Sequence, residues 1–256
     1  MPQDQEGEAR ASIAPGLVSW PHSAGRNVLL DGLLPDESTR LCARMDRVRL
    51  NRGERLAGLG RSPSHAYFLL SGLAVLDYEI GNGQCTSVSV VGREGVVGLS
   101  LFMSGETSPI GASVIAPGEA FRLRADVLVA ERRVVAGIPV CVLRYMQALT
   151  TQMAQTAVCN RHHLLPQQLS RWLLLAFDRI DDGDLRITHE VLAQLLGVRR
   201  EGVTVAIGAL VEAGCLRTSR AHVAMGDRAR LEAASCDCYR IIRDEYARLL
   251  GTYRRS

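Results

Sequence analysis

Apolar residues between Val48 and Arg124 occur in short runs that are separated by glycine-containing breaks. Two of these runs, Ala74–Ile80 and Thr86–Val91, flank the sequence Gly81-Asn82-Gly83. Glycine and asparagine tolerate the positive φ that tight hairpin turns require, so this segment predicts a β-hairpin. Many short strands at spacings of roughly 8–12 residues are typical of an all-β barrel or roll. We therefore expect a β-roll in the first half of the chain.

The apolar spacing becomes helical between residues 136 and 163. Residues recur there at intervals of four and three, which is the heptad pattern of two helices packed side by side. The predicted seam consists of Val142, Met146, Leu149, Met153, Thr156 and Asn160. Polar flanks such as Gln147 and Gln155 make the stripe narrow and favour a dimer of two such helices. The alternative is a helix that packs this stripe against its own β-roll.

The stretch from Ile187 to Gly226 shows the spacing of two short helices followed by a hairpin. Thr188 is placed to cap a first helix, and Gly197 occurs where a tight turn needs a positive φ. A second helix is expected over Arg199–Ala213, and two strand-like runs with a polar tip follow it. This order predicts a helix-turn-helix with a wing, whose second helix enters the major groove of DNA.

The outer side of the second helix carries groups that can read base edges. They are Arg199, Arg200, Glu201 and Thr204. An arginine fork matches the O6 and N7 acceptors of guanine, and a glutamate accepts a hydrogen bond from N4 of cytosine. Three further residues are placed to hold phosphates, namely Thr188, Ser219 and Arg220. The alternative is an α-hairpin with a charged, solvated face.

These patterns divide the chain into five segments. They are a loose tail (1–26), a β-roll sensor domain (27–135) that begins with a helical stretch over Asn27–Arg49, a dimerisation helix (136–163), a winged helix-turn-helix domain (164–226) and a C-terminal helical extension (227–256). Asp227 is the expected N-cap of a single last helix in that extension.

Charge changes this picture only slightly. The 256 residues include 30 basic and 27 acidic side chains, and every basic side chain is arginine. The surplus of three lies in residues 161–256, where 15 arginines occur with 12 acidic residues. A chain without lysine mainly indicates a coding bias, so the composition indicates a polyanionic partner only weakly.

The cysteines and the lengths of the apolar runs indicate in which cellular compartment the protein is expected. The seven cysteines are odd in number and scattered, which is typical of reduced thiols in a cytoplasm. The longest apolar run, Trp172–Phe177, has six residues, whereas a membrane span needs about 20. The first 26 residues contain no apolar segment of the kind found in secretion signals. We expect a cytoplasmic protein without a membrane partner, and no constellation of residues indicates an enzyme.

Three stretches resemble the Crp/Fnr family of bacterial transcription regulators. They are His65–Gly72 (HAYFLLSG), Gly92–Gly98 (GREGVVG) and Ile187–Glu201 in the expected helix-turn-helix. The resemblance covers about residues 27–226 and implies an α+β fold with a cyclic-nucleotide-binding-like β-roll, a long dimerisation helix and a C-terminal winged helix-turn-helix. It also implies a homodimer on a palindromic site in double-stranded DNA, with RNA polymerase as a further partner. The family's reading pair of arginine and glutamate falls on Arg200 and Glu201.

Two positions depart from the family pattern. The cyclic-nucleotide pocket of the family uses an arginine-serine pair for the phosphate, and that position falls on Ile110-Gly111. A cyclic phosphate buried without a charged partner costs roughly several kcal/mol, so we predict that cyclic AMP does not control this protein and leave any cofactor unassigned. Val205 replaces a further reading arginine, which predicts a different half-site. The alternative function is a small-molecule-, redox- or metal-sensing module whose winged helix binds a protein partner.

Five residues are candidates for a metal or redox site. They are Cys159, His162, His163, Cys236 and Cys238. Cys159 and His163 are four residues apart, so a helix places them on one face. Cys236 and Cys238 are two residues apart, and a continuous helix would rotate their thiols about 200° from each other. This spacing favours buried structural thiols and histidines in hydrogen bonds, and the sequence predicts no metal.

Overall fold

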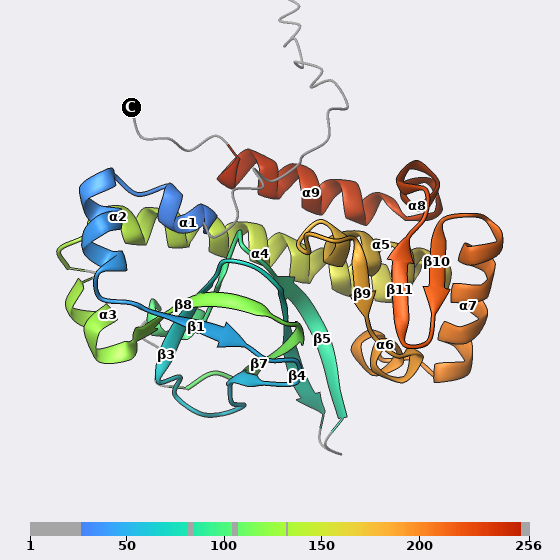
Figure 1. The fold of residues 1–256 in the computed structure, drawn as a ribbon, viewed down its shortest axis with the longest axis horizontal. Coiled ribbons are helices and arrows are strands. Elements are labelled where there is room, and N and C mark those ends of the chain that lie inside the picture. The colour runs from blue at the N-terminus through green and yellow to red at the C-terminus, as the bar shows by residue number, and fades with distance from the viewer. Residues whose placement is uncertain (1–26, 81–83, 104–106, 132, 252–256) are drawn as a thin grey trace, which may run out of the picture.

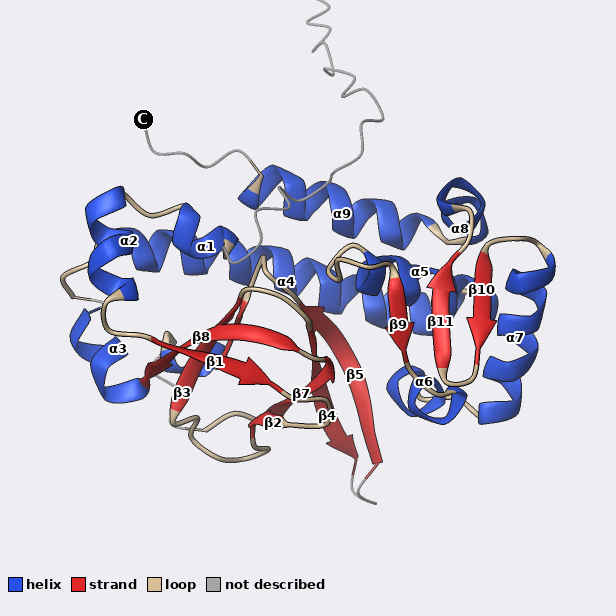
Figure 2. Cartoon of the chain, in the orientation of Figure 1, coloured by secondary structure: helices blue, strands red, loops and turns tan. Residues whose placement is uncertain are grey.

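The computed structural model describes residues 27–80, 84–103, 107–131 and 133–251. The tail expected at residues 1–26, the turn Gly81–Gly83 and the last five residues of the C-terminal extension lie outside the described residues. Figure 1 shows a β-roll below one end of a long helix and a smaller domain with its own sheet beside the other end. Helices and strands thus segregate into the expected α+β architecture (Figure 2).

The β-roll consists of two four-stranded sheets whose strands pair in antiparallel fashion. The first sheet contains, in spatial order, β1 (Asp46–Leu50), β8 (Gly118–Arg124), β3 (His65–Leu69) and β6 (Val96–Val97). The second contains β2 (Arg55–Ala57), β7 (Ile110–Ala116), β4 (Leu73–Ile80) and β5 (Gln84–Val91). The expected β-hairpin is confirmed, because β4 and β5 pair up to Ile80 and Gln84.

Short helices close the β-roll. They are α1 (Val28–Asp31), α2 (Pro35–Cys42), the 3-10 helix η1 (Leu99–Leu101) and α3 (Ala125–Glu131). The helical stretch expected over Asn27–Arg49 is therefore wrong in its second part. Helix α2 begins at Pro35 and ends at Cys42, and the residues from Asp46 onward pair with β8 instead of continuing it.

The long helix α4 extends from Gly137 to His162. Three residues of its predicted dimer seam are covered by this chain, because Val142 and Leu149 are 4% exposed and Thr156 is also buried. Met146 and Met153 are half-buried, whereas Asn160 is exposed. The assignment of the three covered residues to a dimer seam is thus wrong, and the alternative of packing within the chain holds for them. Apolar residues at heptad spacing here pack α4 against other parts of the same chain.

The C-terminal domain follows α4 directly. It contains α5 (Leu165–Phe177), β9 (Asp184–Arg186), α6 (His189–Leu196), α7 (Arg200–Glu212), β10 (Leu216–Ser219) and β11 (His222–Met225). The three strands form one sheet in the order β10-β11-β9. The wing was expected as a hairpin of two strands. β9 adds a third strand because Leu185 is apolar and pairs with Val223, where both side chains are buried.

The C-terminal extension contains two helices where one was expected. Asp227 caps α8 (Arg228–Ala234), as predicted, and its side chain accepts a hydrogen bond from the Arg230 amide. The backbone then becomes extended at Ser235 and Cys236, and α9 runs from Asp237 to Leu250. Figure 1 shows α9 folded back along α4. Within the described residues, no helix combines the length and the apolar character that crossing a membrane requires.

A buried ion pair joins the C-terminal domain to the β-roll. The Arg179 Nε donates to Glu94 Oε1 at 2.7 Å, and the two side chains are 2% and 0% exposed. Glu94 belongs to the GREGVVG stretch, and its Oε1 also accepts from the Gly92 amide. The Arg179 guanidinium lies over the Tyr246 ring, so α9 belongs to the same junction. The two domains are therefore fixed to each other through a desolvated contact.

Candidate DNA-binding site

The helix-turn-helix is built from α6 and α7. Thr188 caps α6, and its Oγ1 accepts a hydrogen bond from the Val191 amide at 3.2 Å. Gly197 ends α6 with a φ of 68°, a conformation that costs glycine little and other residues more. Leu192 and Val203 are fully buried between the helices and the rest of the domain. The apolar core thus fixes the angle of α7 and leaves its outer face to solvent.

The N-terminus of α7 presents exposed charged groups. Arg199, Arg200 and Glu201 are exposed, as the sequence predicts for base-reading residues. The Arg200 Nε lies 3.9 Å from Glu190 Oε2, and both side chains are mostly exposed. Such an exposed ion pair contributes little, so the guanidinium is available to another anion or acceptor.

In the next turn of α7, Thr204 makes a contact that the sequence did not predict. The Thr204 hydroxyl donates to the Arg200 carbonyl and lies 3.0 Å from His189 Nδ1. His189, which sequence reasoning did not select, therefore supports the face that Thr204 occupies. Its only sequence signal was its position directly after the capping Thr188. The neighbouring Val205 is 73% exposed, an unusual position for a large apolar side chain on the surface.

The wing is a tight hairpin. Ser219 pairs with His222, and Arg220 and Ala221 form the turn between them. Ser219 and Arg220 are exposed at this tip, and Ala221 has a φ of 58°. His222 Nδ1 lies 3.2 Å from Asp184, so β9 braces the base of the wing. The two predicted phosphate contacts thus extend from a supported three-stranded sheet.

Comparison with known proteins identifies this arrangement. The family model of the Crp-like helix-turn-helix domain matches residues 167–234, which include all of α6, α7 and the wing. A CRP-like cAMP-activated global transcriptional regulator of Mycobacterium tuberculosis is 24% identical over 215 residues, covering 79% of this chain and 94% of that protein. Residues 167–234 therefore form a Crp-like helix-turn-helix domain, and the chain as a whole is similar to Crp-like transcriptional regulators.

Solved structures of the Crp/Fnr family share the fold. A regulator of this family from Eubacterium rectale aligns with a TM-score of 0.61 at 16% identity and covers 80% of this chain and 96% of its own. A CRP-family regulator from Thermus thermophilus aligns with a TM-score of 0.60 at 19% identity, covering 73% and 95%. The β-roll, the long helix and the helix-turn-helix domain thus recur together in both relatives.

A cavity lies between the β-roll and α4. Its volume is about 410 Å³, and its lining is mostly apolar. It includes Leu76, Val97, Ile110, Gly111, Met146 and Met153. Among the described residues, no arginine and no carboxylate lines it. Glu94 of the GREGVVG stretch pairs with Arg179 and does not line the cavity.

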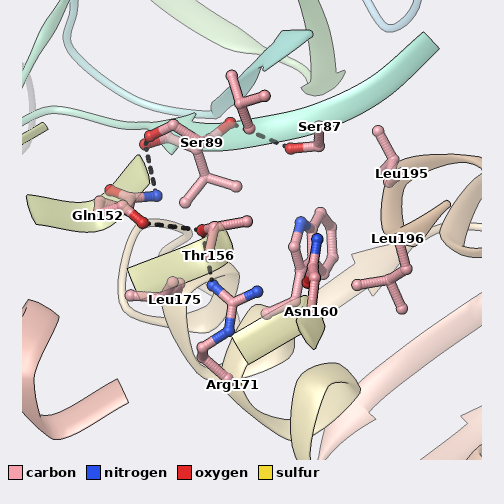
Figure 3. Close-up of a pocket in the computed structure, with 12 residues that line it drawn as sticks. Ser87, Ser89, Gln152, Thr156, Asn160, Arg171, Leu175, Leu195 and Leu196 are labelled. Atoms are coloured by element: carbon pink, nitrogen blue, oxygen red, sulfur yellow. Dashed lines mark hydrogen bonds between the residues drawn. The ribbon is translucent and has the colours of Figure 1, made fainter. Parts of the chain in front are cut away.

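A polar chain connects α5 to the β-roll through α4 (Figure 3). Arg171 Nη1 on α5 donates to Thr156 Oγ1 at 3.1 Å, and the Thr156 hydroxyl donates to the Gln152 carbonyl at 2.8 Å. The Gln152 amide donates to the Val90 carbonyl of β5. Asn160, predicted in the dimer seam, is exposed and lines the edge of this junction together with Leu196 of α6. Side chains of the expected seam thus contact the DNA-binding domain of their own chain.

The structure brings four of the five metal candidates together. Ligand atoms of Cys159, His163, Cys236 and Cys238 all lie within 4.8 Å of one another, whereas His162 is exposed and lies outside this group. The expectation that the spacing of the last two cysteines separates their thiols is wrong. The extended backbone at Cys236, the N-cap of α9, turns both thiols toward Cys159.

Burial governs the protonation of this group. Burial is the main cause that raises the pKa of the Cys159 thiol, against the opposing charge of Arg171. Burial, followed by the neighbouring Cys236, raises the pKa of Cys238 to about 12. Without a bound cation, both side chains are therefore thiols at neutral pH.

Proposed function

We propose that this protein is a cytoplasmic, sequence-specific DNA-binding transcription regulator that acts as a homodimer on a palindromic site. The observation that carries the proposal is the exposed N-terminus of α7, where no close ion pair within the described residues engages Arg199, Arg200 or Glu201. A helix that enters the major groove by its N-terminus needs such groups there. Thr188, Ser219 and Arg220 hold the phosphates on either side. RNA polymerase is the further partner that transcription regulation requires.

The dimer face that we propose lies one residue beyond the predicted seam. The residues at Leu143, Gln147, Thr150, Ala154, Ala157 and Arg161 keep the intervals of four and three, and all six are exposed. Leu143 is 62% exposed, and Val158 beside this stripe is 46% exposed. Small residues in the middle of the stripe allow two helix backbones to approach closely. A second copy of α4, related by a two-fold axis, is the occupant that fits a self-complementary stripe of this kind.

Selection of DNA from a random pool tests the proposal. Full-length protein should enrich a two-fold-symmetric sequence whose half-sites are about 34 Å, or one helical turn, apart. Affinity for that sequence should fall steeply as salt rises, because the arginines release counterions from the phosphates. Enrichment of no sequence, together with an affinity that salt leaves unchanged, would contradict DNA binding through α7.

Two arginine substitutions should have different signatures. Arg200→Ala should cost roughly 1–3 kcal/mol on the selected site and relax the preference at one base position, because a base contact is lost. Arg220→Ala should weaken binding to all sequences and lower the salt slope by about one, because a phosphate contact is lost. Gel shifts on the selected site and on single-base variants measure both effects. An equal loss on every sequence for Arg200→Ala would assign that residue to a phosphate instead.

Cyclic AMP should leave this protein unaffected. The cavity beside α4 offers no described arginine to the cyclic phosphate, and Ile110 and Gly111 occupy the expected position. Calorimetry should therefore detect no binding, and the gel shift should not change when cyclic AMP is added. The M. tuberculosis relative, named as cAMP-activated, is the positive control. Saturable binding that raises the affinity for DNA would overturn this part of the proposal.

A further inference from the structure

A cluster of three buried thiols and one half-exposed imidazole lies where α4 ends and α9 begins. Cys159 lies in the last turn of α4 and His163 is the C-cap of that helix, whereas Cys236 and Cys238 come from the start of α9. The Cys159 and Cys236 sulfur atoms are 3.5 Å apart, and Cys238 Sγ is 3.6 Å from His163 Nδ1. These four residues are called the thiol cluster below.

The distances in the thiol cluster match a single tetrahedral ion. Zinc–sulfur bonds of about 2.3 Å in a tetrahedron place neighbouring sulfur atoms about 3.8 Å apart. The largest separation in the cluster, 4.8 Å, needs only small side-chain movements to reach that geometry. A multinuclear iron–sulfur cluster needs ligands that lie farther apart, because several atoms stand between its sulfur ligands.

A buried arginine, Arg171, lies beside the thiol cluster. Arg171 is 2% exposed, and its Nε donates to Cys159 Sγ at 3.2 Å. Within the described parts of the chain, no carboxylate forms an ion pair with Arg171, and its other described partner is the neutral hydroxyl of Thr156. A buried guanidinium without a counter-charge is strongly unfavourable.

A divalent ion would resolve this imbalance. Three thiolates and a neutral imidazole around a doubly charged ion carry a net charge of one negative unit, which equals the charge of Arg171 in magnitude. Three sulfur ligands and one nitrogen ligand are a ligand set that zinc takes at structural sites. Four protein ligands fill the tetrahedron and leave no position for a substrate, so the site is structural or regulatory and not catalytic.

We propose that Cys159, His163, Cys236 and Cys238 bind one zinc ion per chain. The ion ties the C-terminal end of α4 to the first turn of α9, across the two ends of the DNA-binding domain. Its position follows from the break between α8 and α9, which turns Cys236 and Cys238 to the same side. Arg171 orients the site by donating to the Cys159 sulfur. The contact adds a metal-dependent link to the junction between sensor and DNA-binding domains.

Metal analysis of the full-length protein tests the proposal. Protein purified under reducing conditions without chelators should contain about one zinc per chain. Replacement by cobalt(II) should produce thiolate-to-cobalt charge-transfer absorption and the visible bands of a tetrahedral site. Cys238→Ser and His163→Ala should lose most of the zinc and change these bands. His162→Ala, the exposed neighbour, and Cys215→Ser, a buried cysteine elsewhere, are the matched controls and should keep both.

Several outcomes would overturn the zinc site. They are less than one-tenth of a zinc per chain after incubation with zinc sulfate, cobalt bands that Cys238→Ser leaves unchanged, iron with inorganic sulfide in place of zinc, and a Cys159–Cys236 disulfide in protein kept reduced throughout. Circular dichroism shows whether each variant folds. If Cys238→Ser fails to fold, His163→Ala decides the question, because His163 is half-exposed and its loss disturbs the core least.

Discussion

Replacing Arg179 by methionine is expected to lower the free energy of unfolding by about 3–5 kcal/mol. The substitution keeps much of the side-chain volume but leaves Glu94 as a buried carboxylate without its partner. Among the described residues, Glu94 then keeps only the Gly92 amide as a hydrogen-bond donor, because its Oε2 already lacks one. Urea denaturation followed by circular dichroism measures the loss.

The double variant separates the ion pair from simple packing. Arg179→Met combined with Glu94→Gln removes the uncompensated charge and should recover a large part of the lost stability. Arg240→Met is the control, since Arg240 is mostly exposed and its ion pairs lie in solvent, so its loss should stay within about 0.5 kcal/mol. Equal destabilisation by the single and double variants would show that packing, not charge, dominates at this junction.

Replacing Ala154 by glutamate is expected to dissociate the proposed dimer. Ala154 lies at the centre of the exposed stripe of α4, so a symmetric pair of helices would bring two carboxylates together where water is excluded. Sedimentation should then show a monomer. Affinity for the palindromic site should fall about 10²–10⁴-fold, because the second half-site no longer benefits from linkage to the first.

Ala154→Ser is the matched control, because it is nearly as small and carries no charge. Ala154 is a sharper test position than Met153, whose half-buried side chain also lines the sensor cavity. An intact dimer in the Ala154→Glu variant would assign the partner to another face of the chain. Unchanged affinity of that variant for a single half-site would show that its DNA-binding domain remains folded.

The helix-turn-helix could be predicted from the sequence because its signals are local. Thr188 and Gly197 act within one or two turns of backbone, and their roles follow from capping chemistry and from a positive φ. The alternating runs of the β-roll are similarly local. His189 was missed because its contact with Thr204 depends on the angle between two helices, which no residue spacing specifies.

Residue spacing alone could not show which face of α4 packs within the chain and which face stays exposed. Intervals of four and three identify a stripe but not what covers it. Val142 and Leu149 are apolar because they pack within the chain, and the adjacent stripe that remains exposed is smaller and more polar. The sequence named all four residues of the thiol cluster as candidates, but their convergence could not be predicted for a related reason. The sequence around Ser235 contains no proline or glycine, so nothing in it indicated the break that brings Cys236 and Cys238 to one side.

The return of α9 to α4 changes how the DNA-binding domain can move. The chain leaves α4 at His163, passes through the whole domain and comes back along the same helix, where Tyr246 donates to Gln152. A body held by one tether swings freely about it, whereas a body anchored at both ends keeps mainly the rotation about the line through its anchors. Tilting the domain therefore requires α9 to slide along α4 or to detach from it. Met146 and Met153 of α4 line the cavity. A displacement of α4 at these residues shifts both the end of α4 and the α9 contact, so the DNA-binding domain moves together with α4.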